Sequence, residues 1–207
     1  EGLRDLREVP EARLGNALHA RIWRATRADA PAIDAAVTPL LRNLPYPRSF
    51  LDFETIQPAI PRWAGTRPYQ RTPVQWSCHV QAEPGRLVAL GKLVTSGADP
   101  RRTFAEALLR AMPVDGPVFA YNAGFERSVL LSLADTFPDL APALRALAAR
   151  LFDLLPFVRA HYYHPAMMGS WSIKRVLPTI APDLDYANLD DVQSGDMVEP
   201  VYFELID

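Results

Sequence analysis

Cysteine is almost absent from this chain, since Cys78 is the only one among 207 residues. A single cysteine excludes an intrachain disulfide and any zinc or iron–sulfur site built from cysteines. Such low usage is typical of a reducing compartment. The first residues, EGLRDLREVPEARLG, also lack the apolar core that a signal peptide needs. These two absences predict a cytoplasmic protein.

Long apolar runs are missing as well, and no stretch approaches the roughly 20 residues of a transmembrane helix. We therefore expect no membrane partner. A basic excess is also lacking, because the formal net charge is −2, which argues against a large non-specific DNA-binding surface. Lys92 and Lys174 are the only lysines. A biased genome produces such an arginine-rich usage, and so does a need for phosphate contacts.

Apolar residues are plentiful, at 49% of the chain, which excludes wholesale disorder. Their spacing predicts a helical extension or linker over residues 1–44, with helices at 11–28 and 31–43. The patterns downstream predict strands at 49–54, 73–81, 86–94, 117–121 and 151–155, and helices at 103–112, 124–134, 140–150 and 172–177. Loops and turns fill the remainder. Residues 45–207 are therefore expected to form an α/β domain, a mixed sheet with helices on both faces.

Two acids stand close together in Leu51-Asp52-Phe53-Glu54. Side chains two apart on a strand point the same way, so Asp52 and Glu54 share one face. Like charges this close raise one pKa or recruit a cation. Mg²⁺ prefers a few carboxylates plus water and phosphate oxygens, and two such ions can clamp a phosphodiester. Solvated acids at a strand end would look the same, so the pair alone leaves both interpretations open.

A second group of residues lies where the predicted strand at 117–121 runs into a helix near Gly124. Asn122 is the expected N-cap of that helix, because its side chain can accept a backbone N–H. Glu126 falls in the first turn, where the helix dipole favours negative charge. Capping and the dipole are sufficient to explain both residues when this segment is taken by itself.

Taken in order, these segments resemble the motifs of the DnaQ-like (DEDD) 3′–5′ exonucleases, which have an RNase H-like fold. Asp52-Phe53-Glu54 resembles the first motif. Asn122–Glu126 resembles the second, with Glu126 where that superfamily usually has Asp. Leu151–Leu155 is similar to the Asp-Thr-Leu strand that follows, and Gly169–Lys174 is similar to the Ser-Leu helix after it.

The resemblance extends to one uncharacterised bacterial family of that superfamily, a domain of unknown function, over roughly residues 45–207. The family's motifs look like LDFET, GTRPY, QWS followed by His, YNA followed by FE, and YHP with a later GS, S, K and VLP. The corresponding segments here are Leu51–Thr55, Gly65–Tyr69, Gln75–His79, Tyr121–Glu126 and Tyr163–Pro178.

This resemblance implies a metal-dependent nuclease that hydrolyses phosphodiester bonds of DNA or RNA, as a 3′–5′ exonuclease on single strands. The cofactors would be two Mg²⁺ or Mn²⁺ ions. Catalytic roles would fall to Asp52, Glu54 and Glu126, and metal ligation to Asp52, Glu54 and Asp153. Substrate binding is assigned to Asn122, Phe125, Arg67 and Lys174.

Three arginines follow the acid strand and flank Gly65-Thr66, namely Arg62, Arg67 and Arg71. They can contact substrate phosphates through bidentate hydrogen bonds. A solvated loop explains them equally well, and the sequence leaves the two interpretations open.

The last DEDD motif, an acid on a late helix preceded by His or Tyr, has no clear counterpart. Tyr202 and Asp207 have suitable residue types, but we interpret them as a coincidence because a helix needs several turns. We expect the motif beyond residue 207, so that the domain lacks its last helix. The alternative is a catalytically incomplete module that binds nucleic acid or a partner, and a third is a structural domain whose acids cap a sheet.

Overall fold

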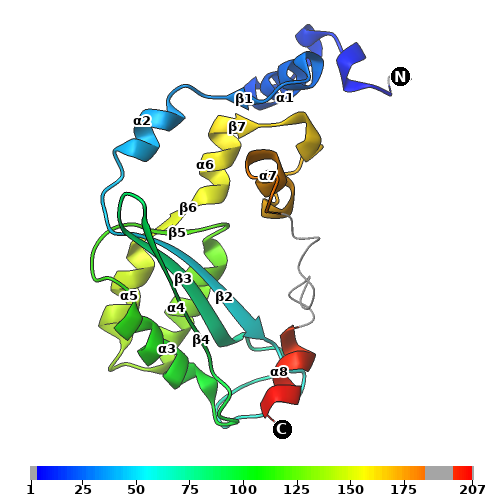
Figure 1. Ribbon diagram of the computed structural model, residues 1–207. Helices are drawn as coiled ribbons and strands as arrows, with labels where there is room; N and C mark the ends of the chain where they lie inside the picture. The colour runs from blue at the N-terminus through cyan, green and yellow to red at the C-terminus, as the bar shows by residue number, and fades with distance from the viewer. Residues whose placement is uncertain (1–3, 185–197, 207) are drawn as a thin grey trace. The chain divides into compact units, whose positions relative to one another are not determined.

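The structure, a computed structural model, describes residues 4–184 and 198–206. The chain divides into two compact units (Figure 1). We call residues 44–153 and 198–206 the sheet unit, and residues 4–43 and 154–184 the helical unit. Across these described ranges, no helix has the length and apolar character needed to cross a lipid bilayer.

Five strands form the main sheet, in the order β4-β3-β2-β5-β6. Their bounds are β2 Arg48–Ile56, β3 Thr72–Glu83, β4 Arg86–Leu93, β5 Val118–Ala120 and β6 Leu151–Asp153. The pairs β2–β3 and β3–β4 are antiparallel, whereas β2–β5 and β5–β6 are parallel. A meander followed by parallel strands on its first strand is the RNase H-like arrangement, so the predicted fold class is confirmed.

Three helices cover one face of this sheet: α3 Pro100–Ala111, α4 Gly124–Thr136 and α5 Ala141–Ala149. The alternation along β2 explains which face is covered, because buried Leu51 and Phe53 point toward these helices. Fully buried Phe104 of α3 meets Phe53 edge to face, with ring centroids 5.1 Å apart. Asp52 and Glu54 consequently lie on the opposite face of the sheet.

A further helix, α8 Val198–Ile206, packs beside the carboxyl end of β2 (Figure 1). Tyr202 is buried against Ile56 and Val74, and its hydroxyl donates a hydrogen bond to the carbonyl of Val94 at 2.8 Å. The expectation of loop and turn here was wrong. The chain keeps helical structure because one apolar face of a short helix packs on the sheet. Asp207 lies outside the described residues.

The helical unit joins two distant parts of the sequence. Its elements are α1 Ala17–Ala28, β1 Ala32–Ile33, α2 Val37–Arg42, α6 Leu154–His161, β7 Tyr162–Tyr163 and α7 Ile173–Ile180, with three short 3₁₀ helices at 6–8, 11–13 and 165–167. β1 pairs with β7 in an antiparallel ladder. Ala25, Tyr163, Met167 and Val176 form its buried apolar cluster. The sequence pattern had predicted that residues 154–184 belong to the domain 45–207.

Two predicted elements of this part of the chain were wrong. Residues 31–43 are not one helix, because the Asp34 carboxylate accepts the N–H of Ala36 at 2.9 Å and turns the chain between β1 and α2. The strand expected at 151–155 ends at Asp153, which pairs with Ala120, the last residue of β5. The helix α6, which the sequence analysis missed, begins at the next residue.

Candidate active site

The candidate site lies at one edge of the main sheet. Strands β2, β5 and β6 run parallel, so their carboxyl ends meet at the same edge. Asp52 and Glu54 stand toward that end of β2, and Asp153 is the last residue of β6. Glu126 lies in the first turn of α4, the helix that follows β5. Three separate segments therefore bring four carboxylates to one region of the sheet unit.

The two acids of β2 lie beside polar residues of β3. Asp52 is opposite Ser77, and Glu54 is opposite Gln75. Asp52 remains exposed, yet the protein around it desolvates the carboxyl enough to raise its pKa. Glu54 is half-buried, and its pKa is raised by burial first and then by the charge of Asp52. Neither carboxyl gains from a nearby cation, so both ionised forms are disfavoured.

Glu126 is the most buried of these acids, at 3% exposure. Its pKa is raised to about 7, by burial first and to a smaller extent by the charges of Asp52 and Asp153. Within the described part of the chain, its Oε2 atom is buried without a hydrogen-bond partner. A buried polar atom without a partner is costly. A proton on the carboxyl or a bound group would remove that cost.

The turn between β5 and α4 depends on Asp153. Its Oδ1 atom accepts the backbone N–H of Asn122 at 3.0 Å. Asn122 has a left-handed backbone with φ of 66°, and the N-cap position belongs to Ala123, which makes no side-chain capping bond. The predicted N-cap at Asn122 was therefore wrong. A capping side chain requires extended backbone, whereas this tight turn needs a positive φ, which asparagine tolerates.

The side chains present suit a hard divalent cation in kind, because carboxylate oxygens are the ligands that Mg²⁺ and Mn²⁺ prefer. The Oε2 atom of Glu126 lacks a hydrogen-bond partner, and the raised pKa values of Asp52 and Glu54 mean that a bound cation would favour their ionised forms. As these side chains lie, no three His, Cys, Asp or Glu residues at positions 4–184 and 198–206 converge closely enough to hold one ion. The donor chemistry fits a metal ion, with Asp52, Glu54 and Asp153 as the candidate ligands.

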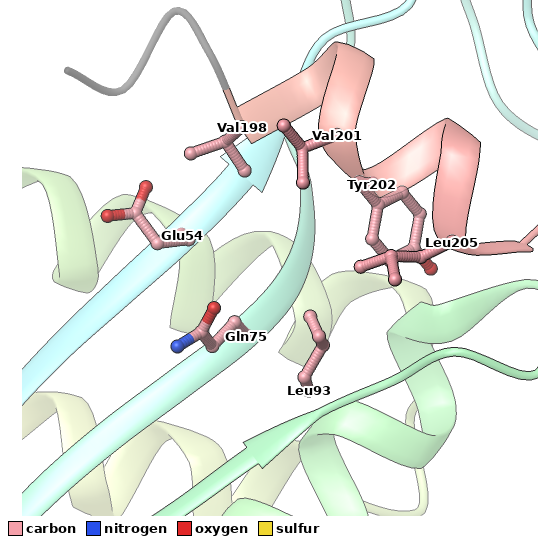
Figure 2. A pocket seen from close by; sticks show the side chains of 7 residues that line it. All are labelled: Glu54, Gln75, Leu93, Val198, Val201, Tyr202 and Leu205. Carbon is pink, nitrogen blue, oxygen red and sulfur yellow. The ribbon is translucent and has the colours of Figure 1, made fainter. Parts of the chain in front are cut away.

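A pocket of about 300 Å³ adjoins the site, between α8 and the open face of the sheet (Figure 2). Glu54 and Gln75 supply its polar wall, and its apolar lining consists of Leu93, Val198, Val201, Tyr202 and Leu205. Figure 2 shows Glu54, Gln75 and Leu93 side by side on three adjacent strands, beneath the helix. Sequence analysis missed this pocket. The alternation of apolar and polar residues along β3 predicted that Gln75 faces outward. The sequence did not reveal the strand register that places Gln75 beside Glu54.

The residues predicted to bind substrate lie in different places. Phe125 is half-buried at the start of α4, and the Arg71 guanidinium lies over its ring, 5.4 Å from the centroid. Arg67 is exposed on the loop between β2 and β3, where its N–H donates to Gln70 Oε1 at 3.1 Å. Lys174 is exposed on α7, which belongs to the helical unit. Of these residues, Asn122 and Phe125 share the turn that carries Glu126.

Comparison with known proteins gives one match. A family model described as a domain of unknown function (DUF2779) matches residues 49–172, which is more than half of the chain. The matched segment contains Asp52, Glu54, Glu126 and Asp153. Neither the curated proteins nor the solved structures contain a match.

Proposed function

Since the chain belongs to the family DUF2779, a domain of unknown function, its chemistry has to be inferred from its own residues, and we propose that it is a metal-dependent nuclease. The substrate would be a single strand of DNA or RNA, cleaved at phosphodiester bonds from the 3′ end. The observation that carries this proposal is the gathering of four carboxyl groups at the carboxyl edge of an RNase H-like sheet, where Asp52, Glu54 and Glu126 have raised pKa values. The order of the motifs, which resembles that of the DnaQ-like exonucleases, supports it.

The proposed roles follow from the position of each acid. Asp52 and Glu54 hold the cations on the open face of β2, and Asp153 adds a carboxylate while it fixes the turn at Asn122. Bound divalent cations would supply positive charge to the attacking and leaving oxygens of a phosphodiester. Glu126, whose pKa is about 7, holds a proton on its buried carboxyl below neutral pH. Positive charge brought beside it favours the ionised form, because an opposite charge lowers the pKa of a carboxyl.

We propose Mg²⁺ or Mn²⁺ as the cofactor. The test is a cleavage assay on 3′- and 5′-labelled single strands of DNA and RNA, with Mn²⁺, Mg²⁺ or EDTA. We expect stepwise shortening from the 3′ end that requires the metal. If the folded protein leaves every substrate intact in Mn²⁺, the nuclease proposal is wrong.

A second candidate is a module that binds nucleic acid or a protein partner without turnover. The arrangement of the acids favours it, because no three of them converge on one point in the described residues. The module would retain a single strand in EDTA with unchanged affinity and would never cleave it. The same assay, run alongside a binding measurement, separates the two candidates.

A further inference from the structure

Arg71 reaches the acid-bearing edge of the sheet through the topology. It immediately precedes β3, whose first residue, Thr72, pairs with Ile56 at the carboxyl end of β2. Because β3 is antiparallel to β2, Arg71 lies beyond the end of β2 that bears Asp52 and Glu54. The same edge holds the start of α4.

A ring contact fixes the side chain of Arg71 there. Its guanidinium lies over the ring of Phe125, 5.4 Å from the centroid, and Phe125 directly precedes Glu126 in the first turn of α4. A guanidinium stacked on an aromatic face loses little further freedom when its N–H groups bind an anion. The stack therefore presents a preorganised cation beside the candidate site.

The loop that delivers Arg71 is tied down at several points. The Trp63 indole N–H donates to the carbonyl of Gly97 at 3.1 Å. The backbone N–H of Tyr69, which has a left-handed φ of 56°, donates to the carbonyl of Pro58 at 2.9 Å. Backbone held this closely can keep Arg71 in place during binding.

Unlike many exposed arginines of this chain, Arg71 has no acidic partner among residues 4–184 and 198–206. Carboxylates pair with six others: Arg7, Arg24, Arg86, Arg102, Arg110 and Arg145. Arg71 is also absent from the causes that set the pKa values of Asp52, Glu54 and Glu126. The guanidinium thus lies beside the turn that carries Glu126 without pairing with a carboxylate, and its N–H groups stay available to an external anion.

We propose that Arg71 binds a phosphate of the substrate strand, through paired hydrogen bonds to its two non-bridging oxygens. This inference rests on the proposed function and adds the contact that positions the strand. Arg67 and Arg71 share one loop, but only Arg71 has an aromatic ring of the acid-bearing turn beneath it. Phosphate contacts fix the register of a strand and carry no sequence preference.

The test measures binding of a labelled single strand by fluorescence anisotropy, in EDTA so that no turnover occurs. Arg71→Met is expected to weaken binding about tenfold, in line with the loss of a charge-assisted pair of hydrogen bonds. It should also reduce the slope of log affinity against log salt by about 0.7, the value for one phosphate contact on a single strand. Arg71→Lys should restore the slope and only part of the affinity, because lysine keeps the charge without the fork. Arg110→Met, on α3, is the matched control and should leave both quantities unchanged.

A substrate series locates the phosphate. Single methylphosphonate linkages, which carry no charge, are placed at successive positions of the strand. The loss of affinity caused by Arg71→Met should disappear when one particular linkage is uncharged. It should persist when the uncharged linkage is at any other position. An equal loss at every position, or affinity and slope unchanged in Arg71→Met, or no binding by the wild-type chain, would overturn the inference. Cleavage that continues normally in Arg71→Met refutes this inference alone, whereas normal Arg71-dependent binding without any cleavage refutes the nuclease proposal alone.

Discussion

Asp52→Asn is expected to lower kcat for metal-dependent cleavage by about 10³-fold or more. Asparagine has nearly the same shape as aspartate but carries no charge, so it cannot balance a divalent cation. A bound metal contributes several kcal/mol to stabilisation of the transition state, and each 1.36 kcal/mol corresponds to a factor of ten in rate. The measurement is steady-state cleavage of a labelled strand at saturating strand and saturating Mn²⁺, which gives kcat.

The control for this prediction is Asp135→Asn, on the last turns of the helix that carries Glu126. Asp135 is exposed, and its Oδ1 atom lies 2.5 Å from Nη2 of Arg145 in a surface ion pair. Such an exposed pair contributes little to stability. Both variants should keep the circular dichroism spectrum of the wild type, and only Asp52→Asn should lose activity. Equal activity in Asp52→Asn and wild type would remove Asp52 from the mechanism.

Glu126→Gln is expected to stabilise the fold at pH 8 when no metal is present. Glu126 is buried, and its pKa in the folded chain is about 7, compared with an ordinary value of 4.5. The folded state therefore binds more protons than the unfolded state between these values. Stability from this group is complete below about pH 4.5 and is lost as the pH rises through about 7. The difference between the two pKa values corresponds to about 3 kcal/mol of folding stability that the wild type loses above pH 7. Glu126→Gln keeps this stability because glutamine cannot ionise.

Urea unfolding in EDTA at several pH values between 4.5 and 8 measures this effect. The free energy of unfolding of Glu126→Gln, minus that of wild type, should increase steadily across the window and level off above pH 7. Glu204→Gln, an exposed position on α8, is the control and should give a flat difference. A flat difference for Glu126→Gln would mean that the buried carboxyl ionises as readily as one in water.

The main sheet was predictable because its signals are local. Alternating burial along β2 and β3, and the turn at Pro84-Gly85 between β3 and β4, place these strands within a few residues of their observed bounds. The helices that follow have apolar residues at helical spacing, which buries them on one face. Together with the chain order, these patterns were sufficient for a mixed α/β sheet, and the resemblance of the motifs to the DnaQ-like exonucleases implied the RNase H-like class.

Elements that depend on distant partners were not predictable. β1 has two residues and exists because β7 pairs with it from more than a hundred positions away. α8 is stabilised by the packing of Tyr202 against Ile56 and Val74, a contact that no local pattern reveals. The grouping of residues 154–184 with the N-terminal segment has the same origin.

The candidate site shows the same division. Alternation in β2 was enough to place Asp52 and Glu54 on one face, and the strand-to-helix turn was enough to locate Glu126. The sequence alone gave neither the burial of Glu126 nor the anchoring of Asn122 by Asp153. Both arise where three strands end together, and they depend on the pairing register of β5 with β2 and β6.

A titration with Mn²⁺ tests most directly whether the acidic edge holds a divalent cation. Electron paramagnetic resonance measures binding as a loss of the free-ion signal. The wild-type chain should take up Mn²⁺ and release it to EDTA, Asp52→Asn and Asp153→Asn should each bind it much more weakly, and Asp135→Asn should bind it like the wild type. Identical Mn²⁺ binding in all four proteins, or none in the wild type, would contradict the account.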